Sequence, residues 1–413
     1  MIESPPVLAN RLWERARGLA LRERLLARRG RSVHERRPVV LVPGMCGTRL
    51  TNQRGGVIWG SIAALYVGRG VGGRDDVQPG GLLRELMLVP GLLAYDVFGG
   101  LVRALGRAGF VEGEDLFVLD YDWREGVAAG ALALGELIAR IRGFAPAPRQ
   151  DRVDLIAVST GGLVARAYLG YAGADPLSGG APTGGAPVAR VIHVGVPQRG
   201  SFDALACLHR GFRFAPAGRL FSPAEAAACQ ISWDALPHPD DGVFVDQRGQ
   251  ALALDLYDPE VWSRLGLGDA RGAAERPARL ARARALHRAL DRASALPAPD
   301  SVVIGACHLP TPARVLVRDG GAPAYVPPPF PRRDDPFVGY VYRPGDGELP
   351  ETSLRALPGL AADRVWQVRP RKHAALPSDP AVHRLVIEAL LATERFIPST
   401  DVTRKPSLAV IQD

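Results

Sequence analysis

One segment of the sequence combines an apolar strand, a serine and an amphipathic helix without an intervening loop. The run Val153–Val158 leads into Ser159, and a helix-forming stretch that ends at Tyr171 follows directly. A serine at such a turn adopts a strained backbone conformation, which requires small residues two positions before and after it. Ala157 and Gly161 meet this requirement. The segment predicts a serine hydroxyl that is presented above a sheet and can act as a nucleophile.

A nucleophilic serine needs a general base, which in this arrangement follows the serine along the chain. Two histidines, His373 and His383, lie in the last quarter of the sequence. His373 falls in a loop after the apolar run Val365–Val368. His383 lies inside a predicted helix that has Asp379 as its N-cap and Pro380 at its first position. We therefore favour His373 as the base and keep His383 as the alternative.

The base needs an acid to orient it, and Asp346 is the favoured candidate. It stands between Gly345 and Gly347, which allow the chain to turn sharply and aim a short carboxylate at a histidine. Asp334 and Asp335 are the alternatives, but they follow two arginines and resemble a solvated run of charges. The sequence therefore predicts that Asp346 faces the catalytic histidine.

Two backbone amides are candidates to stabilise the oxyanion that forms when a serine attacks a carbonyl. The first belongs to Thr160, which follows the serine at the predicted helix N-terminus. The second belongs to Met45 in the loop after the apolar run Val39–Val42, where Gly44 allows a close approach.

Short apolar runs that alternate with helical stretches must position these residues. Continuous β-branched runs of this kind are typical of a mostly parallel sheet that is covered by helices on both faces, and the fold class is therefore α/β. The predicted strands are Val39–Val42, Leu86–Val89, Leu116–Leu119, Val153–Val158, Val191–Val196, Val302–Ala306 and Val365–Val368.

Several segments depart from this rhythm and define the domain organisation. An arginine-rich amphipathic helix is predicted at 8–29, either packed on the domain's flank or lying on an anionic membrane. A glycine-rich stretch around Trp59 and Tyr66 is expected to be a mobile lid with exposed aromatic rings. The expected divisions are an N-terminal extension at 1–37, a core at 38–200 with the lid-like insertion 51–81, a cap at 201–300, the rest of the core at 301–397, and a tail at 398–413.

Composition excludes several classes of protein. The chain has 413 residues, of which 47% are hydrophobic and 23% charged, so it can bury a large core. The net charge is +8, but among 51 basic residues only Lys372 and Lys405 are lysine. This arginine excess reflects a compositional bias, and we expect no nucleic-acid partner. We expect a cytoplasmic protein, because the sequence shows no secretory signal and no apolar run of membrane-spanning length.

The four cysteines show neither disulfide nor metal-binding spacing. Cys207 has His209 nearby and Cys307 is followed by His308, but neither couple has the second pair of ligands that a metal site needs. We expect free thiols, and neither a metal nor a cofactor.

In its ordered motifs the chain resembles the lecithin:cholesterol acyltransferase family of α/β-hydrolases, which includes lysosomal phospholipases and bacterial lipase-like members. The resemblance covers nearly all of residues 38–395. The motifs that carry it are Pro38–Leu50, Val89-Pro90-Gly91, Tyr121-Asp122-Trp123-Arg124, the serine turn, Gly195–Ser201, Pro310-Thr311-Pro312, Gly345-Asp346-Gly347 and His373.

The resemblance implies an α/β-hydrolase fold with Ser159 as nucleophile, Asp346 as acid and His373 as base. It also implies that Met45 and Thr160 are the oxyanion donors, and that 201–300 caps an acyl-binding cleft. Three positions depart from the family pattern, which has glycine, histidine and threonine where this sequence has Ala157, Val158 and Glu348.

The sequence thus predicts a serine-dependent acyl hydrolase or O-acyltransferase that acts on lipid esters, with peripheral contact to an anionic membrane. The alternative is a catalytically silent binding or effector module. The irregular serine turn and the basic N-terminal helix motivate that alternative.

Overall fold

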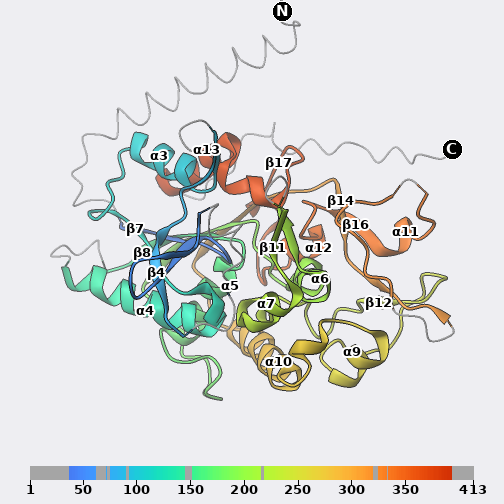
Figure 1. Cartoon of the computed structure of the whole chain (residues 1–413). Coiled ribbons are helices and arrows are strands. Elements are labelled where there is room, and N and C mark those ends of the chain that lie inside the picture. The colour runs from blue at the N-terminus through green and yellow to red at the C-terminus, as the bar shows by residue number, and fades with distance from the viewer. Residues whose placement is uncertain are drawn as a thin grey trace, which may run out of the picture.

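A six-stranded parallel sheet forms the centre of the protein (Figure 1). The computed structural model describes residues 37–61, 71, 75–89, 93–144, 151–214, 218–319, 324–332 and 334–392. The strand order is β17-β13-β9-β8-β1-β7, and each neighbouring pair is parallel. The strands are β1 (Val39–Val42), β7 (Leu116–Val118), β8 (Val153–Val158), β9 (Val188–Val194), β13 (Asp300–Ala306) and β17 (Val365–Val368). The expected mostly parallel sheet is confirmed.

One predicted strand does not join this sheet. The run Leu86–Val89 lies in β5 (Glu85–Val89), which pairs antiparallel with β6 (Leu93–Asp96). Leu86 is buried but Met87 is exposed, an alternation that is typical of a hairpin with one covered face. The prediction of a strand at Leu86–Val89 is therefore confirmed, but the prediction that it joins the central sheet is wrong.

Helices cover both faces of the sheet because side chains alternate along each strand. Val40, Leu155 and Ala157 pack with α4 (Val127–Phe144) and α5 (Gly161–Tyr171) in one core cluster. Leu41 and Ile156 point the other way and pack with α3 (Gly99–Arg107) and α13 (Pro380–Leu391). Figure 1 shows these two layers on opposite sides of the sheet. Asp379 caps α13 as predicted, since its carboxylate accepts from the Ala381 amide.

The segment that follows β1 forms a small antiparallel sheet beside the centre of the molecule. Its strands are β2 (Thr48–Asn52), β3 (Val57–Trp59) and β4 (Val77–Leu82). The expectation of an exposed, membrane-binding Trp59 is wrong. Its ring is only 4% exposed and stacks on Phe221 at 5.1 Å, and its Nε1 donates to the Cys46 carbonyl. Tyr66, the other aromatic residue of the expected lid, lies outside the described residues.

Residues 201–300 contain most of a second core. The elements are α6 (Phe202–Arg210), β10 (Phe212–Phe214), β11 (Gly218–Phe221), α7 (Pro223–Ala228), α8 (Gln230–Asp234), β12 (Phe244–Val245), α9 (Pro259–Leu265) and α10 (Arg276–Ala293). Phe202, Phe244 and Trp262 are buried in this cluster. It extends beyond residue 300, because β12 pairs with β15 (Val315–Leu316). The second half of α10 instead packs in the main core through Leu286 and Leu290.

The segment before β17 contributes shorter elements around one end of the sheet. β14 (Leu309–Pro312) pairs antiparallel with β16 (Tyr342–Gly345). The helices α11 (Val338–Val341) and α12 (Glu351–Leu354) flank β16, and the 3-10 helix η7 (His373–Ser378) follows β17. The end of β16 and the start of η7 place two of the predicted site residues.

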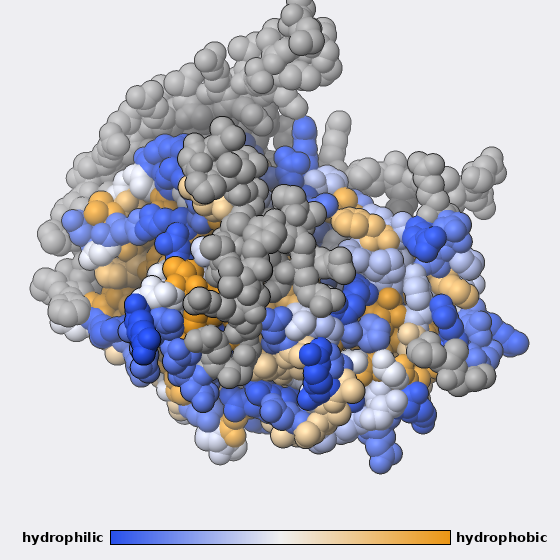
Figure 2. Space-filling view, in the orientation of Figure 1, coloured by the Kyte–Doolittle hydropathy of each residue, from blue (hydrophilic) through white to orange (hydrophobic). Residues whose placement is uncertain are grey.

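The distribution of hydrophobic residues on the surface is relevant to the expected contact with a membrane. Figure 2 shows hydrophobic residues in several small areas that are separated by hydrophilic ones, outside the part covered by grey atoms. None of the helices in the described ranges is both long and apolar enough to cross a bilayer. The predicted helix at 8–29 and the tail at 398–413 lie outside the described residues.

Two leucines of α4 test the assignment of its buried face. Leu134 is fully buried and Leu132 is 36% exposed. We expect Leu134→Ala to lower the free energy of unfolding by about 2–5 kcal/mol, because it removes buried methyl groups and leaves a cavity. The matched control Leu132→Ala should change it by less than about 0.5 kcal/mol. Urea denaturation measures both, and equal effects would contradict the assigned face.

Candidate active site

The turn from β8 into α5 has the strained geometry that the sequence predicts. Ser159 has a φ of +53°, in the left-handed region, and its amide donates to the Val194 carbonyl at 2.9 Å. A Cβ atom at Gly161 would lie 2.3 Å from the Val42 carbonyl oxygen, so only glycine fits there. Ala157 stands where the family pattern has glycine, and its side chain is fully buried in the core.

Ser159, His373 and Asp346 lie in one chain of hydrogen bonds. Ser159 Oγ is 2.9 Å from His373 Nε2, and His373 Nδ1 is 2.8 Å from Asp346 Oδ2. The other carboxylate oxygen of Asp346 accepts from the amides of Glu348 and Leu349. With Nδ1–H donating to Asp346, Nε2 is free to accept the serine proton. The arrangement can activate the serine hydroxyl as a nucleophile.

Backbone geometry holds the histidine in place. The His373 amide donates to the Asp346 carbonyl at 3.0 Å, in addition to the bond between their side chains. Gly195, which follows β9 with a φ of +56°, makes room for the ring, since a Cβ there would lie 3.1 Å from His373 Cε1. Acid and base are thus held as a unit against the end of β9.

The alternative residues lie elsewhere. His383 is buried in α13, where its Nε2 contacts the Pro377 carbonyl at 2.7 Å. Asp335 accepts from the Tyr325 hydroxyl and the Phe337 amide. Asp334 is exposed and forms a long ion pair with Arg332 at 3.7 Å. The structure therefore brings together the favoured residues and not their alternatives.

The two expected oxyanion donors differ in availability. The Met45 amide donates to the Thr160 hydroxyl at 2.7 Å, so it does not face the cavity as an open donor. The Thr160 amide donates no hydrogen bond to any described residue. In this conformation the Thr160 hydroxyl occupies the Met45 amide, because the hydroxyl lies within reach of the loop after β1. The role of the two amides as oxyanion donors stays a prediction.

An apolar cavity of about 240 Å³ opens beside the serine. Ser159, Thr160 and His373 line it together with Met45. Most of the remaining wall is apolar, and it includes Trp59, Leu83, Leu86, Phe98, Phe212 and Phe221. The cavity thus joins a potential nucleophile to space for an apolar chain.

Two further carboxyl groups, those of Asp203 and Glu348, line the same cavity. Glu348 departs from the pattern of the family that the sequence resembles, and no sequence signal marks Asp203. Burial raises the pKa of both groups, that of Glu348 to about 8. The negative charge of Asp346 adds to the effect in both, and Asp203 adds to it for Glu348. At neutral pH Glu348 is therefore largely protonated.

These carboxyl groups affect the histidine. Burial by itself lowers the pKa of His373, but Asp346 and Glu348 outweigh this effect and raise it to about 9. Because a general base must be neutral to accept a proton, this environment favours basic conditions for the reaction.

The other reactive groups are not arranged for metal or thiol chemistry. All four cysteines are free, and burial raises the pKa of the Cys46 thiol well above its ordinary value. Within the described ranges, no group of three or more His, Cys, Asp or Glu residues is placed to hold a metal ion.

Titration of His373 tests the influence of Glu348. We expect the imidazole of the wild-type protein to titrate near pH 9, well above a free histidine. Glu348→Gln should lower this pKa, because it removes a nearby negative charge. Histidine NMR signals followed against pH measure the shift, with Glu85→Gln on the exposed hairpin as the control. An unchanged His373 titration in Glu348→Gln would contradict the inferred coupling.

Comparison with known proteins shows the fold. The sequence matches no protein-family profile and no curated protein. Among solved structures, a chain of the crystal structure of the Tle4–Tli4 complex is similar, with a TM-score of 0.54 and 14% sequence identity. The match covers 85% of this chain and 97% of that chain. At this identity the likeness establishes a shared arrangement of a mostly parallel sheet flanked by helices.

Proposed function

We propose that this chain is an α/β-hydrolase that acts as a serine-dependent acyl hydrolase or O-acyltransferase on lipid esters. The observation that carries the proposal is the hydrogen-bonded chain from Ser159 through His373 to Asp346 at the wall of an apolar cavity. The ordered motifs that resemble the lecithin:cholesterol acyltransferase family support the same assignment.

In the proposed reaction, Ser159 Oγ attacks the ester carbonyl while its proton passes to His373 Nε2. Asp346 accepts from Nδ1–H, which keeps the ring in the required tautomer and stabilises the imidazolium. The Thr160 amide stabilises the oxyanion. The Met45 amide can join it only when the Thr160 hydroxyl releases it. His373 then protonates the leaving alcohol, and an acyl-enzyme remains.

The composition of the cavity supports an ester with an apolar acyl chain. Aromatic rings from β3, from Phe98 at the N-cap of α3 and from the 201–300 segment line the same cavity as the serine. Water or an alcohol then takes the acyl group from Ser159. Both acceptors compete for one intermediate, so the proposal covers hydrolysis and transfer.

A fluorophosphonate probe tests the proposal against a catalytically silent binding module. The probe reacts with an activated serine, so we expect it to label the wild-type protein and not Ser159→Ala. Ester turnover should fall by about 10⁴-fold or more in that variant, because the three residues act as a unit. An unlabelled but folded wild-type protein, as judged by circular dichroism, would instead favour the silent module.

The base and acid have matched variants. We expect His373→Ala and Asp346→Asn each to lower kcat/KM by up to about 10⁴-fold, the second because it favours the wrong imidazole tautomer. His383→Ala and Asp334→Asn are the controls and should keep nearly wild-type turnover of a short soluble ester. The assignment fails if either control loses activity while its counterpart retains it.

The lipid substrate class is tested with one ester presented in two forms. We expect an ester in anionic vesicles to be turned over faster than the same ester as monomer, and salt should reduce the difference by screening arginine contacts. Removal of residues 1–30 should weaken vesicle binding and spare the soluble ester. Equal rates on both forms, with no effect of the truncation, would contradict action at a lipid surface.

A further inference from the structure

A second cavity, of about 380 Å³, opens at the end of the sheet where β8 and β9 begin, opposite the end that carries Ser159. Its wall includes Arg152 and Val188, at the beginnings of β8 and β9, whereas Ser159 follows the last residue of β8. Helices α5 and α10, the loop after α10 and the segment 183–186 before β9 form much of the remaining wall. The proposed acyl-transfer reaction does not use this cavity.

A buried arginine lines it without a carboxylate partner. Arg166 on α5 is only 8% exposed, and its guanidinium donates to the Gln198 carbonyl at 2.6 Å and to Ser294 Oγ at 3.3 Å. It forms no ion pair with any residue in the described ranges. Burial lowers its pKa to about 10. A buried charge without a counter-ion is costly, and the guanidinium of Arg166 lacks an anion in direct contact with it.

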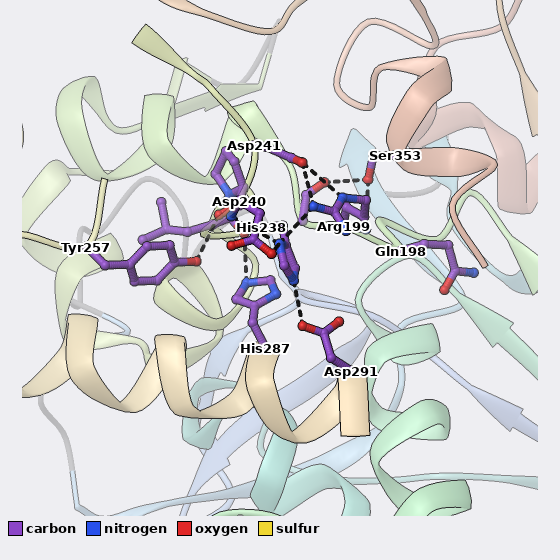
Figure 3. Close-up of polar contacts among 12 residues, drawn as sticks. Gln198, Arg199, His238, Asp240, Asp241, Tyr257, His287, Asp291 and Ser353 are labelled. Atoms are coloured by element: carbon purple, nitrogen blue, oxygen red, sulfur yellow. Dashed lines mark hydrogen bonds and ion pairs between the residues drawn. The ribbon is translucent and has the colours of Figure 1, made fainter. Parts of the chain in front are cut away.

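The nearest acidic group is held by another residue. Asp291 on α10 lies close enough to act on Arg166 electrostatically. Its carboxylate, however, is 2.9 Å from His238 Nε2, and Figure 3 shows it turned toward that ring. His238 belongs to a polar cluster with Arg199 and Asp241 that satisfies its own charges. None of these groups neutralises Arg166 by direct contact.

A buried histidine supplies a second donor. His193 on β9 is 1% exposed and lines the cavity. The side-chain amide nitrogen of Gln198 lies 3.3 Å from its Nδ1, so with the amide in this orientation Nδ1 accepts and Nε2 carries the proton. Burial and the charge of Arg166 lower the pKa of His193 to about 3, so the ring is neutral.

The rest of the wall matches an anion with an apolar body. Among the described residues that line it there is no aspartate or glutamate, and the exposed Arg152 adds a second positive charge. The apolar lining comprises Leu169, Val188, Leu290, Leu296 and Leu357, with prolines of the 297–299 loop. We propose that this cavity binds a carboxylate with a short alkyl chain, whose oxygens pair with Arg166 and accept from His193 Nε2–H. The proposal does not depend on the chemistry at Ser159.

Calorimetric titration with octanoate at pH 7.5 tests this site in the full chain. We expect octanoate to bind this cavity and raise Tm, and octylamine, of equal chain length and opposite charge, not to bind there. Arg166→Met should weaken octanoate binding at least tenfold, whereas Arg140→Met, an exposed arginine of α4, should leave it unchanged. Ser159→Ala should also bind octanoate normally, which separates this result from the proposed function.

A second variant keeps the test informative if Arg166→Met does not fold. Ala298 is exposed at the cavity wall, so Ala298→Trp should obstruct the alkyl chain without disturbing the core. We expect it to weaken octanoate at least fivefold. Inorganic phosphate is the headgroup control. The proposal would be overturned if phosphate bound and octanoate did not, or if octanol bound as well as octanoate. Wild-type octanoate affinity in both cavity variants would also overturn it.

Discussion

The left-handed backbone of Ser159 is the constraint on which the rest of the site depends. A non-glycine residue in that region costs on the order of 1–3 kcal/mol, so the surrounding structure must hold it there. The sheet does so, because β9 accepts the Ser159 amide and the end of β1 lies against Gly161. The close approach of the β1 loop also places the Met45 amide at the Thr160 hydroxyl. One strained residue thus fixes the spacing of β1, β8 and α5.

Charge is distributed unevenly around α5. At the N-terminal end of this helix the cavity contains Asp203 and Glu348 beside the acid and base of the proposed site. Farther along the helix, Arg166 lines a cavity without acidic residues. In both places burial makes an ionised side chain unfavourable, but carboxyl groups and arginine differ in how they lose or keep their charge. Carboxyl groups can become protonated near neutral pH, whereas an arginine keeps its charge and requires an anion.

Most of the central sheet and the order of the site residues were predictable, since apolar runs and chain order are local properties. The contacts that join Ser159, His373 and Asp346 were anticipated in this way. The pairing of Leu86–Val89 was not predictable, because a short apolar run does not reveal its neighbours. Glycines around Trp59 suggested exposure, but its burial depends on Phe221, far away in the sequence. The Thr160 hydroxyl and Asp203 were missed because their importance comes from tertiary contacts alone.

The contact between serine and histidine joins residues 214 positions apart, and the histidine follows β17, an edge strand of the sheet. Closing so long a segment of chain costs conformational entropy, which the contacts formed on folding must offset. During synthesis the serine turn emerges well before Asp346 and His373. In the nascent chain Ser159 therefore lacks its contact with His373 until β17 and the segment after it have been made.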